Sequence, residues 1–155
     1  MQGDKKVIAH LNQLLANELT SIDQYFLHSR MLQNWGLQKL YQRIDHEMSD
    51  EQGHAAALIE RILFLDGIPD VAKREALNIG HNVPDMFKHD LKLEIGVAAS
   101  LKVAIAYCEH AADYQTRQIL LGMLKDTEED HAYWLEQQLG LIKKIGLPNY
   151  LQSQL

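Results

Sequence analysis

The stretch IDHEMSDEQGHAAAL, residues 44–58, combines an apolar helical pattern with two side chains that break it. Its apolar residues recur at three- and four-residue steps, as they do on one buried face of an α-helix: Ile44, Met48, Ala55 and Leu58. Glu51 lies on that same face, and His54 follows it one turn later. At this i, i+3 spacing a carboxylate and an imidazole point the same way, so the pair is suited to bind one metal ion.

The same combination recurs along the chain. A second Glu-x-x-His pair lies in the other half of the sequence, and each half also has a single glutamate in an apolar stripe, at nearly the same offset. Carboxylate-bridged dimetal bundles use one Glu from each of two helices and Glu-x-x-His from each of the other two. The sequence therefore predicts a dimetal site with six ligands: Glu18, Glu51, His54, Glu94, Glu128 and His131.

The charge of these glutamates favours a metal site. An unpaired buried carboxylate costs several kcal/mol even after relaxation, and four of them would repel one another. We expect no Lys or Arg at the same level of the stripes, whereas two divalent cations would balance four carboxylates, with two imidazoles as neutral ligands. A site without thiolate suits Fe²⁺ or Mn²⁺. The alternatives are a Glu-x-x-His pair on a solvated helix face and a lone glutamate that extends its carboxylate to solvent.

Helical periodicity covers most of the chain and predicts an all-α bundle. We expect four long helices and a short terminal one, at residues 4–34, 37–65, 83–111, 113–139 and 148–154. Short links make the first two and the last two long helices antiparallel hairpins. Residues 66–82 indicate a loop that reaches ~56 Å at ~3.3 Å per residue, beyond the ~43 Å length of the second helix. The loop can therefore return the chain to the same end, which is the single-crossover layout of ferritin-like four-helix bundles.

The composition is that of a globular protein. The chain has 155 residues, 46% of them hydrophobic and 23% charged, which predicts a single domain over residues 1–155. Its formal net charge of −6 argues against a nucleic-acid partner, because phosphate recognition needs a basic surface. One cysteine, Cys108, excludes a disulfide framework. Since we find neither a signal-like segment nor a run of about 18 apolar residues, we expect no membrane association and a cytoplasmic location.

The chain resembles the bacterioferritins and bacterial ferritins along essentially its whole length. The resemblance rests on the six-ligand pattern and on three segments: NELTSIDQYFLHSRM (17–31), IERILFLDGIPD (59–70) and EEDHAYWLEQQLGLIKKIGLPNYLQSQL (128–155). It implies a hollow shell of twenty-four subunits that oxidises Fe²⁺ with O₂ or H₂O₂ and stores ferric mineral inside. By the same resemblance the six residues are the ligands of an intra-subunit di-iron ferroxidase centre, in which Glu51 and Glu128 bridge the irons.

The resemblance also implies roles for residues outside the ligand set. Tyr25 and Trp134 match aromatic residues near the di-iron site and are candidate electron relays, with core packing as the alternative. His46 and Asp50 match an inner-surface iron site, with a solvated helix face as the alternative. Two further residues match the lining of a pore built from terminal helices: Asn149 and Gln152.

The haem position departs from the bacterioferritin pattern. That pattern has a methionine directly after the second-helix glutamate, donated by both subunits of a two-fold pair, whereas this chain has Gln52 there. An amide is a poor ligand for haem iron compared with a thioether, and neither Met31 nor Met48 is at the matching position. We therefore expect no haem b on this chain alone. The alternative is a mixed shell in which a haem-binding sister subunit supplies the methionine.

Two other functions share parts of this pattern. A di-iron oxygenase or peroxidase would use the same centre on another substrate, but such enzymes usually need a longer chain, a substrate channel or a reductase domain. A helical interaction module without metal would leave four core glutamates unexplained. The sequence therefore favours iron oxidation and storage, and it leaves open the oxidant and the partner that releases iron, for which a ferredoxin-type reductase is the candidate.

Overall fold

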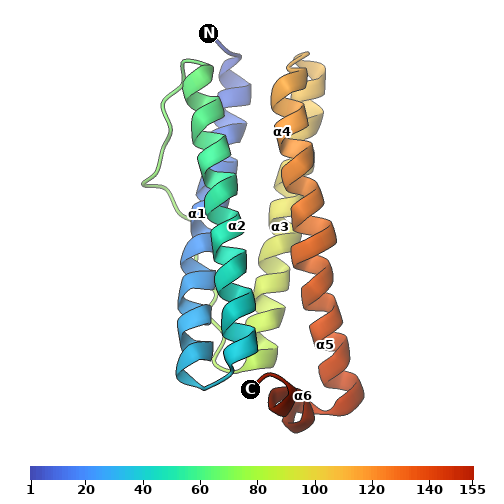
Figure 1. Cartoon of the computed structure of the whole chain (residues 1–155). Helices are drawn as coiled ribbons and strands as arrows, with labels where there is room; N and C mark the ends of the chain where they lie inside the picture. Colours follow the sequence, from blue (N-terminus) through green and yellow to red (C-terminus); the bar gives the residue numbers. More distant parts are fainter.

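The computed structural model describes all residues, 1–155, and contains helices and loops without strands. Four helical rods form the bundle in Figure 1, and the fourth rod is divided into three segments. The helices are α1 (Lys5–Asn34), α2 (Gln38–Phe64), α3 (Val83–His110), α4 (Tyr114–Lys125), the π-helix η1 (Asp126–Ala132), α5 (Tyr133–Ile145) and α6 (Leu147–Ser153). The predicted all-α, ferritin-like four-helix bundle with a short C-terminal helix is confirmed. None of these helices has a stretch long and apolar enough to cross a lipid bilayer.

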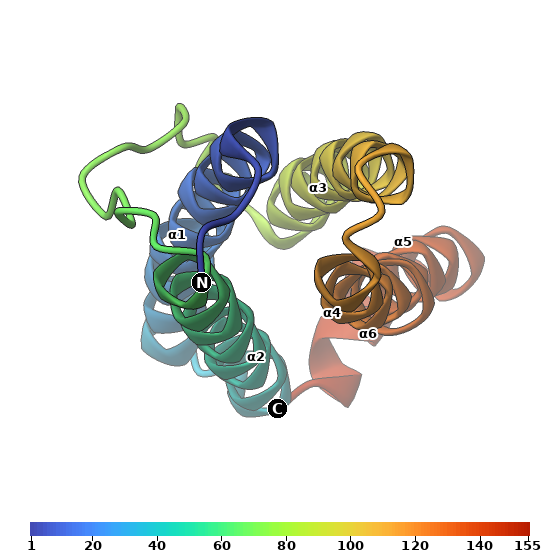
Figure 2. The ribbon, with the colours of Figure 1, turned by 90° about the horizontal axis from the view of Figure 1, so that it is seen from above.

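The connections follow the predicted topology. In Figure 1 the chain descends along α1, ascends along α2, ascends again along α3 and descends along α4 and α5. Residues 65–82 form the crossover segment, which joins the upper end of α2 to the lower end of α3. Figure 2 shows this segment on the outer side of α1, away from α4. Helices α2 and α3 are therefore parallel, as the length of the loop predicts.

Local chemistry determines where the helices begin and end. Asp4 accepts hydrogen bonds from two backbone N–H groups in the first turn of α1. Asn82 and Asp113 each accept one such bond at the start of α3 and of α4. Gly146 ends α5 with φ +82° and ψ 151°, a positive-φ conformation that glycine adopts readily because it has no Cβ. The fourth rod consequently continues to Ile145, so the predicted end at residue 139 is wrong. Gly146 is the residue that terminates the rod.

Hydrogen bonds attach the crossover segment to side chains of α1 that are four residues apart. Backbone N–H groups at positions 75, 78 and 80 donate to Thr20 Oγ1, Gln24 Oε1 and His28 Nε2, at 2.8, 3.1 and 3.0 Å. Asp90 of α3 accepts from Gln24 Nε2 at 2.8 Å and lies 2.9 Å from His28 Nδ1. Because His28 Nε2 accepts a backbone hydrogen bond, we assign a neutral imidazole with its proton on Nδ1. Helical periodicity did not predict these buried contacts, which we call the crossover seam.

Two hydrophobic clusters fill the bundle, one toward each end. Both draw residues from α1, α2, α3 and the fourth rod. The first contains residues from the ranges 7–15, 55–65, 97–108 and 120–123. The second contains residues from the ranges 25–44 and 83–87, together with Leu135 and Tyr150. The positions between these ranges on all four rods are where the predicted metal ligands lie, so a polar layer separates the two clusters.

Candidate metal site

Five of the six predicted ligands meet in this polar layer. Four of them expose 1% or less of their surface and the fifth exposes 8%: Glu18, Glu51, Glu94, His131 and His54. Their donor atoms form two groups, Glu18–Glu51–His54 and Glu51–Glu94–His131, and within each group the atoms lie within 4.8 Å of one another. Glu51 belongs to both groups, so its two oxygens are placed to contact two neighbouring cations.

The two imidazoles face the carboxylates through Nδ1. His54 Nδ1 lies 3.5 Å from Glu51 Oε2 and 3.9 Å from Glu18 Oε2. His131 Nδ1 lies 2.8 Å from Glu51 Oε1 and 3.4 Å from Glu94 Oε1. Both carboxylate oxygens of Glu18 and of Glu51, and both Nδ1 atoms, are buried without a well-aligned hydrogen bond. Since buried polar atoms normally have such partners, this donor set fits bound cations.

The other nitrogen of each imidazole contacts a carboxylate outside the two groups. His54 Nε2 lies 3.0 Å from Asp126 Oδ2. His131 Nε2 lies 2.6 Å from Glu47 Oε2 and 3.3 Å from Asp50 Oδ2. Contacts of this kind fix the ring orientation of metal-binding histidines and make them more basic ligands.

Glu47 is a buried carboxylate of this layer that the sequence patterns did not single out. It exposes 2% of its surface, and its Oε1 lies 2.6 Å from the guanidinium of Arg43. The same guanidinium lies 2.8 Å from Asp130 Oδ1. Glu47 precedes Glu51 by one helical turn, and this spacing is the signal that could have identified it. Arg43 pairs with none of the four predicted glutamates, but Lys102 lies 3.0 Å from Glu128, so the expectation that no Lys or Arg lies at their level is wrong for Glu128.

Burial and neighbouring charges perturb the pKa values of the site. Burial raises the pKa of Glu94 to about 7, and the negative charge of Glu51 adds to this shift. Burial also acts to raise the pKa of Glu51, but the imidazoles of His131 and His54 outweigh it and the net shift is downward. Burial acts to lower the pKa of His131, yet the surrounding carboxylates raise it well above its usual value. The layer thus requires positive charge, which protonated imidazoles or bound cations supply.

The structure places Glu128 apart from the other five predicted ligands. Its side chain is 45% exposed, and its carboxylate lies 3.0 Å from Lys102 Nζ of α3. Glu128 lies 14 residues after Tyr114, the first residue of its rod, whereas Glu51 lies 13 residues after Gln38, the first residue of α2. The fourth rod therefore has one extra residue before its glutamate. The π-helix, whose hydrogen bonds span five residues, accommodates this extra residue in a wider turn. The spacing of Glu128 and His131 predicts that they share one face, but here they do not. The ligand role of Glu128 stays a prediction.

Two aromatic residues lie near the site. Tyr25 is buried and its hydroxyl donates a hydrogen bond to Glu94, and burial together with Glu94 raises the pKa of Tyr25 well above its usual value. Trp134 packs edge-on against Phe87, and the guanidinium of Arg43 lies 4.8 Å from its ring centroid. Both aromatic rings therefore have packing roles, and their roles as electron relays stay predictions.

Of the remaining predicted residues, only Asp50 borders the polar layer, where it forms a group with Glu47, Asp130 and His131 whose donor atoms lie within 4.8 Å of one another. His46 is exposed, and its Nε2 is 3.5 Å from Asp50 Oδ2. Gln52 is exposed on α2, while Met48 is half-buried against the second hydrophobic cluster. The inner-surface iron site and the absence of haem stay predictions. The two predicted pore residues are exposed on α6: Asn149 and Gln152.

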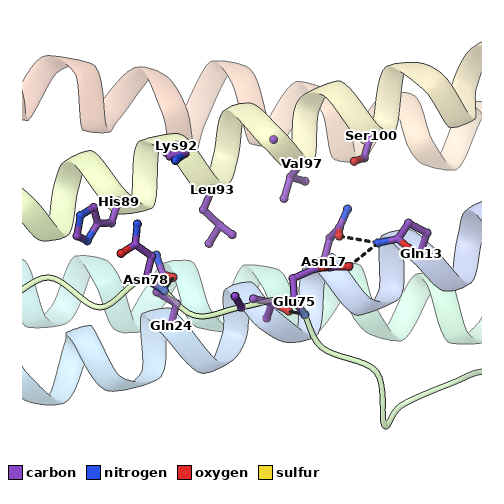
Figure 3. A pocket seen from close by; sticks show the side chains of 13 residues that line it. Gln13, Asn17, Gln24, Glu75, Asn78, His89, Lys92, Leu93, Val97 and Ser100 are labelled. Carbon is purple, nitrogen blue, oxygen red and sulfur yellow. Dashed lines mark hydrogen bonds between the residues drawn. The ribbon is translucent and has the colours of Figure 1, made fainter.

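A polar groove lies between α1, the crossover segment and α3 (Figure 3). Its volume is about 470 Å³. Gln13 Nε2 donates to Asn17 Oδ1 and to Glu75 Oε1, at 3.1 and 2.9 Å, and so ties the segment to α1. Asn17 and Leu93 line the groove and directly precede the buried Glu18 and Glu94. The groove residues and the buried glutamates therefore occupy different faces of the same two helices.

Comparison with known proteins gives one consistent result. A family model described as a ferritin-like domain matches residues 8–145. The chain is 59% identical over 155 residues to a bacterial ferritin from Synechocystis sp., covering 100% of this chain and 99% of that protein. It is 55% identical over 155 residues to a bacterial ferritin from Pseudomonas aeruginosa, covering 100% of both. It is 42% identical over 146 residues to a bacterioferritin from Mycobacterium leprae, covering 94% of this chain and 91% of that protein.

Proposed function

Because the chain belongs to the ferritin family, we propose that it stores iron and oxidises Fe²⁺ in the buried polar layer. The convergence of five buried side chains from four rods on two positions that share Glu51 supports this most directly. The carboxylates of Glu18 and Glu51 have no well-aligned hydrogen-bond donor, and divalent cations would compensate them. Membership of the ferritin family favours iron as that cation.

Two ferrous ions are the proposed substrate of each site. The ligand groups are Glu18–Glu51–His54 for one ion and Glu51–Glu94–His131 for the other. Glu128 is proposed as a further ligand, because four carboxylates then balance two divalent cations. Carboxylate and imidazole ligands without thiolate suit ferrous iron.

Oxidation removes one electron from each Fe²⁺. The two electrons and two protons reduce O₂ to H₂O₂, or reduce H₂O₂ to two waters. His54 and His131 bind iron only as neutral imidazoles, so loading the site releases the protons they carry. Asp126 and Glu47 then hold the two rings in place through their Nε2 atoms. Tyr25, bonded to Glu94, is the candidate electron relay.

We extend this proposal to the assembly that family resemblance implies. Twenty-four copies would form a hollow cytoplasmic shell, with His46 and Asp50 binding iron on its inner surface and a pore at the terminal helices. Gln52 at the haem position favours a shell without haem b, or a mixed shell that contains a haem-binding sister subunit. A ferredoxin-type reductase would release the iron. Native mass measurement with a haem absorbance spectrum tests the assembly.

Anaerobic loading with Fe²⁺ followed by O₂ tests the site itself. Glu51→Ala and His54→Ala should abolish the fast rise in ferric absorbance, because each removes a ligand. Glu60→Ala, which changes an exposed glutamate on the same helix, is the matched control and should oxidise iron like the wild type. Size-exclusion chromatography should show the same assembled species for all proteins.

Fast oxidation by the Glu51→Ala protein would refute the site assignment. Electron microscopy after iron loading separates storage from oxidation that serves another substrate. Dense mineral cores within round shells support storage, and empty particles contradict it.

A further inference from the structure

A pocket of about 330 Å³ opens between α3 and the fourth rod and reaches the buried ligand layer at Glu94. Its inner wall includes Glu94, which exposes only 1% of its surface. Its walls include the small residues Ala98, Ala99 and Ala132, and its mouth carries three exposed charged residues: Lys102, Glu128 and Glu136. A cation that enters this pocket therefore meets exposed carboxylates first and the buried carboxylate of Glu94 last.

Glu128 occupies this mouth because of the π-helix. The extra residue in the fourth rod turns Glu128 outward, while His131, three residues later, points into the ligand layer. The outward position has a specific partner, because Lys102 Nζ lies 3.0 Å from Glu128 Oε2. The side chains of Lys102 and Glu128 are 59% and 45% exposed, so neither is locked by packing. Glu128 is thus held by an ion pair that solvent and cations can reach.

We propose that this pocket is the entrance for divalent cations and that Lys102 is a positioning residue for Glu128. Lys102 holds the carboxylate at the mouth until a cation displaces the ammonium group, and Glu128 then completes the ligands at the Glu51–Glu94–His131 position. This inference rests on the proposed function, since it assumes that the buried layer binds cations. No covalent bond changes in this step, in which one cationic partner of Glu128 replaces another.

The sign of the effect follows from this competition. Lys102 stabilises only the state in which Glu128 points outward, so its removal should tighten cation binding at the second position. Exposed ion pairs are weak, and their measured range predicts an increase in affinity of about 1.5- to 5-fold for Lys102→Met. Lys102→Arg keeps the pair and should bind like the wild type. Lys102→Glu adds a carboxylate to the mouth and should bind more tightly than Lys102→Met.

Co²⁺ titration of the assembled protein tests this, because Co²⁺ reports its ligands by visible absorbance and is stable in air. The Glu18–Glu51–His54 position is an internal control whose affinity should not change in any Lys102 variant. The gain from Lys102→Met should vanish in a Glu128→Gln background, which is the double-mutant cycle for this pair. Lys102 is exposed, so circular dichroism and shell size should match the wild type, and Lys102→Arg provides the conservative rescue.

The outcomes separate the two proposals. An unchanged second-site affinity in Lys102→Met, or the same gain with Glu128→Gln present, overturns the role of Lys102 while leaving the proposed function intact. Wild-type protein that binds no Co²⁺, or binding that survives Glu51→Ala, overturns the proposed function as well. Tighter second-site binding that depends on Glu128 supports the entrance and its positioning residue.

Discussion

Replacing Glu94 with Gln should make the metal-free protein more stable at pH 8. Burial raises the pKa of Glu94 to about 7 from an ordinary value of 4.5. Above that pH the folded protein holds a charge where burial disfavours it, which lowers the free energy of unfolding. Gln removes the charge with little change in shape and keeps an oxygen that accepts the hydrogen bond from Tyr25.

The pKa difference sets the size of the effect. Because the folded-state pKa is raised, the unfolded chain loses its proton first, near pH 4.5, and wild-type stability falls until the pH passes about 7. A shift of about 2.5 units corresponds to about 3 kcal/mol at pH 8, since one unit is ~1.36 kcal/mol. At roughly 2–4 °C per kcal/mol, Tm should rise by roughly 6–12 °C. At pH 5 the difference should fall below about 1 kcal/mol.

Thermal unfolding followed by circular dichroism measures this difference. Wild type, Glu94→Gln and the exposed control Glu60→Gln are compared in a chelator at pH 5 and pH 8, at equal protein concentrations. Excess Co²⁺ should raise the Tm of the wild type more than that of Glu94→Gln, because only the wild type retains the full ligand set. Equal Tm values at pH 8 in chelator, or an equal gap at both pH values, would refute the reasoning.

Three further predictions concern the scaffold around the site. Asp90→Ala should cost about 2–4 kcal/mol, because it leaves a buried amide and imidazole unpaired; limited proteolysis should then cut first within residues 65–82, and an unchanged cleavage pattern contradicts this. Asp113→Ala should cost about 1 kcal/mol at neutral pH through loss of the α4 cap. Burial acts to raise the pKa of Asp113, but hydrogen bonds from the first turn of α4 and from Arg61 outweigh it, so the net shift is downward. The stabilisation from Asp113 is therefore present above its ordinary pKa of 3.8 and is lost as the pH falls through the lowered pKa. Acid titration of unfolding measures this loss. Burial raises the pKa of the Cys108 thiol to about 11, so a thiol reagent should label it only after unfolding, and rapid labelling of the native protein contradicts the packing.

Helical periodicity was sufficient for most of the architecture. Long stripes at three- and four-residue steps predict the rods, because burial of one face is the main source of helix stability in a bundle. The length of the loop predicts the parallel arrangement of α2 and α3, since only a crossover connects them. The same stripes locate Glu18, Glu51 and Glu94, because a carboxylate in an apolar register has to be buried when the helix packs.

Contacts between distant segments could not be read from these stripes. Thr20 and Gln24 are polar residues that look like part of a solvated face, but the backbone of the crossover segment covers them. The sequence patterns did not single out Glu47, whose burial depends on contacts with Arg43 and with His131 of another rod. The orientation of Glu128 depends on a π turn, which is visible in the sequence only as a difference of one residue between the two hairpins.

The polar layer divides the interior of this bundle into two apolar compartments that do not touch each other directly. Only the helices themselves continue through the polar layer from one compartment to the other. A cation held by ligands from separate rods is then a reversible cross-link, which ties together chain segments tens of residues apart and restricts the unfolded chain as a disulfide does. A cation bound in this layer would thus stabilise the bundle at the level where the apolar core is interrupted. Hydrogen exchange of the backbone amides in the polar layer should slow when cations are bound there and accelerate when they are removed.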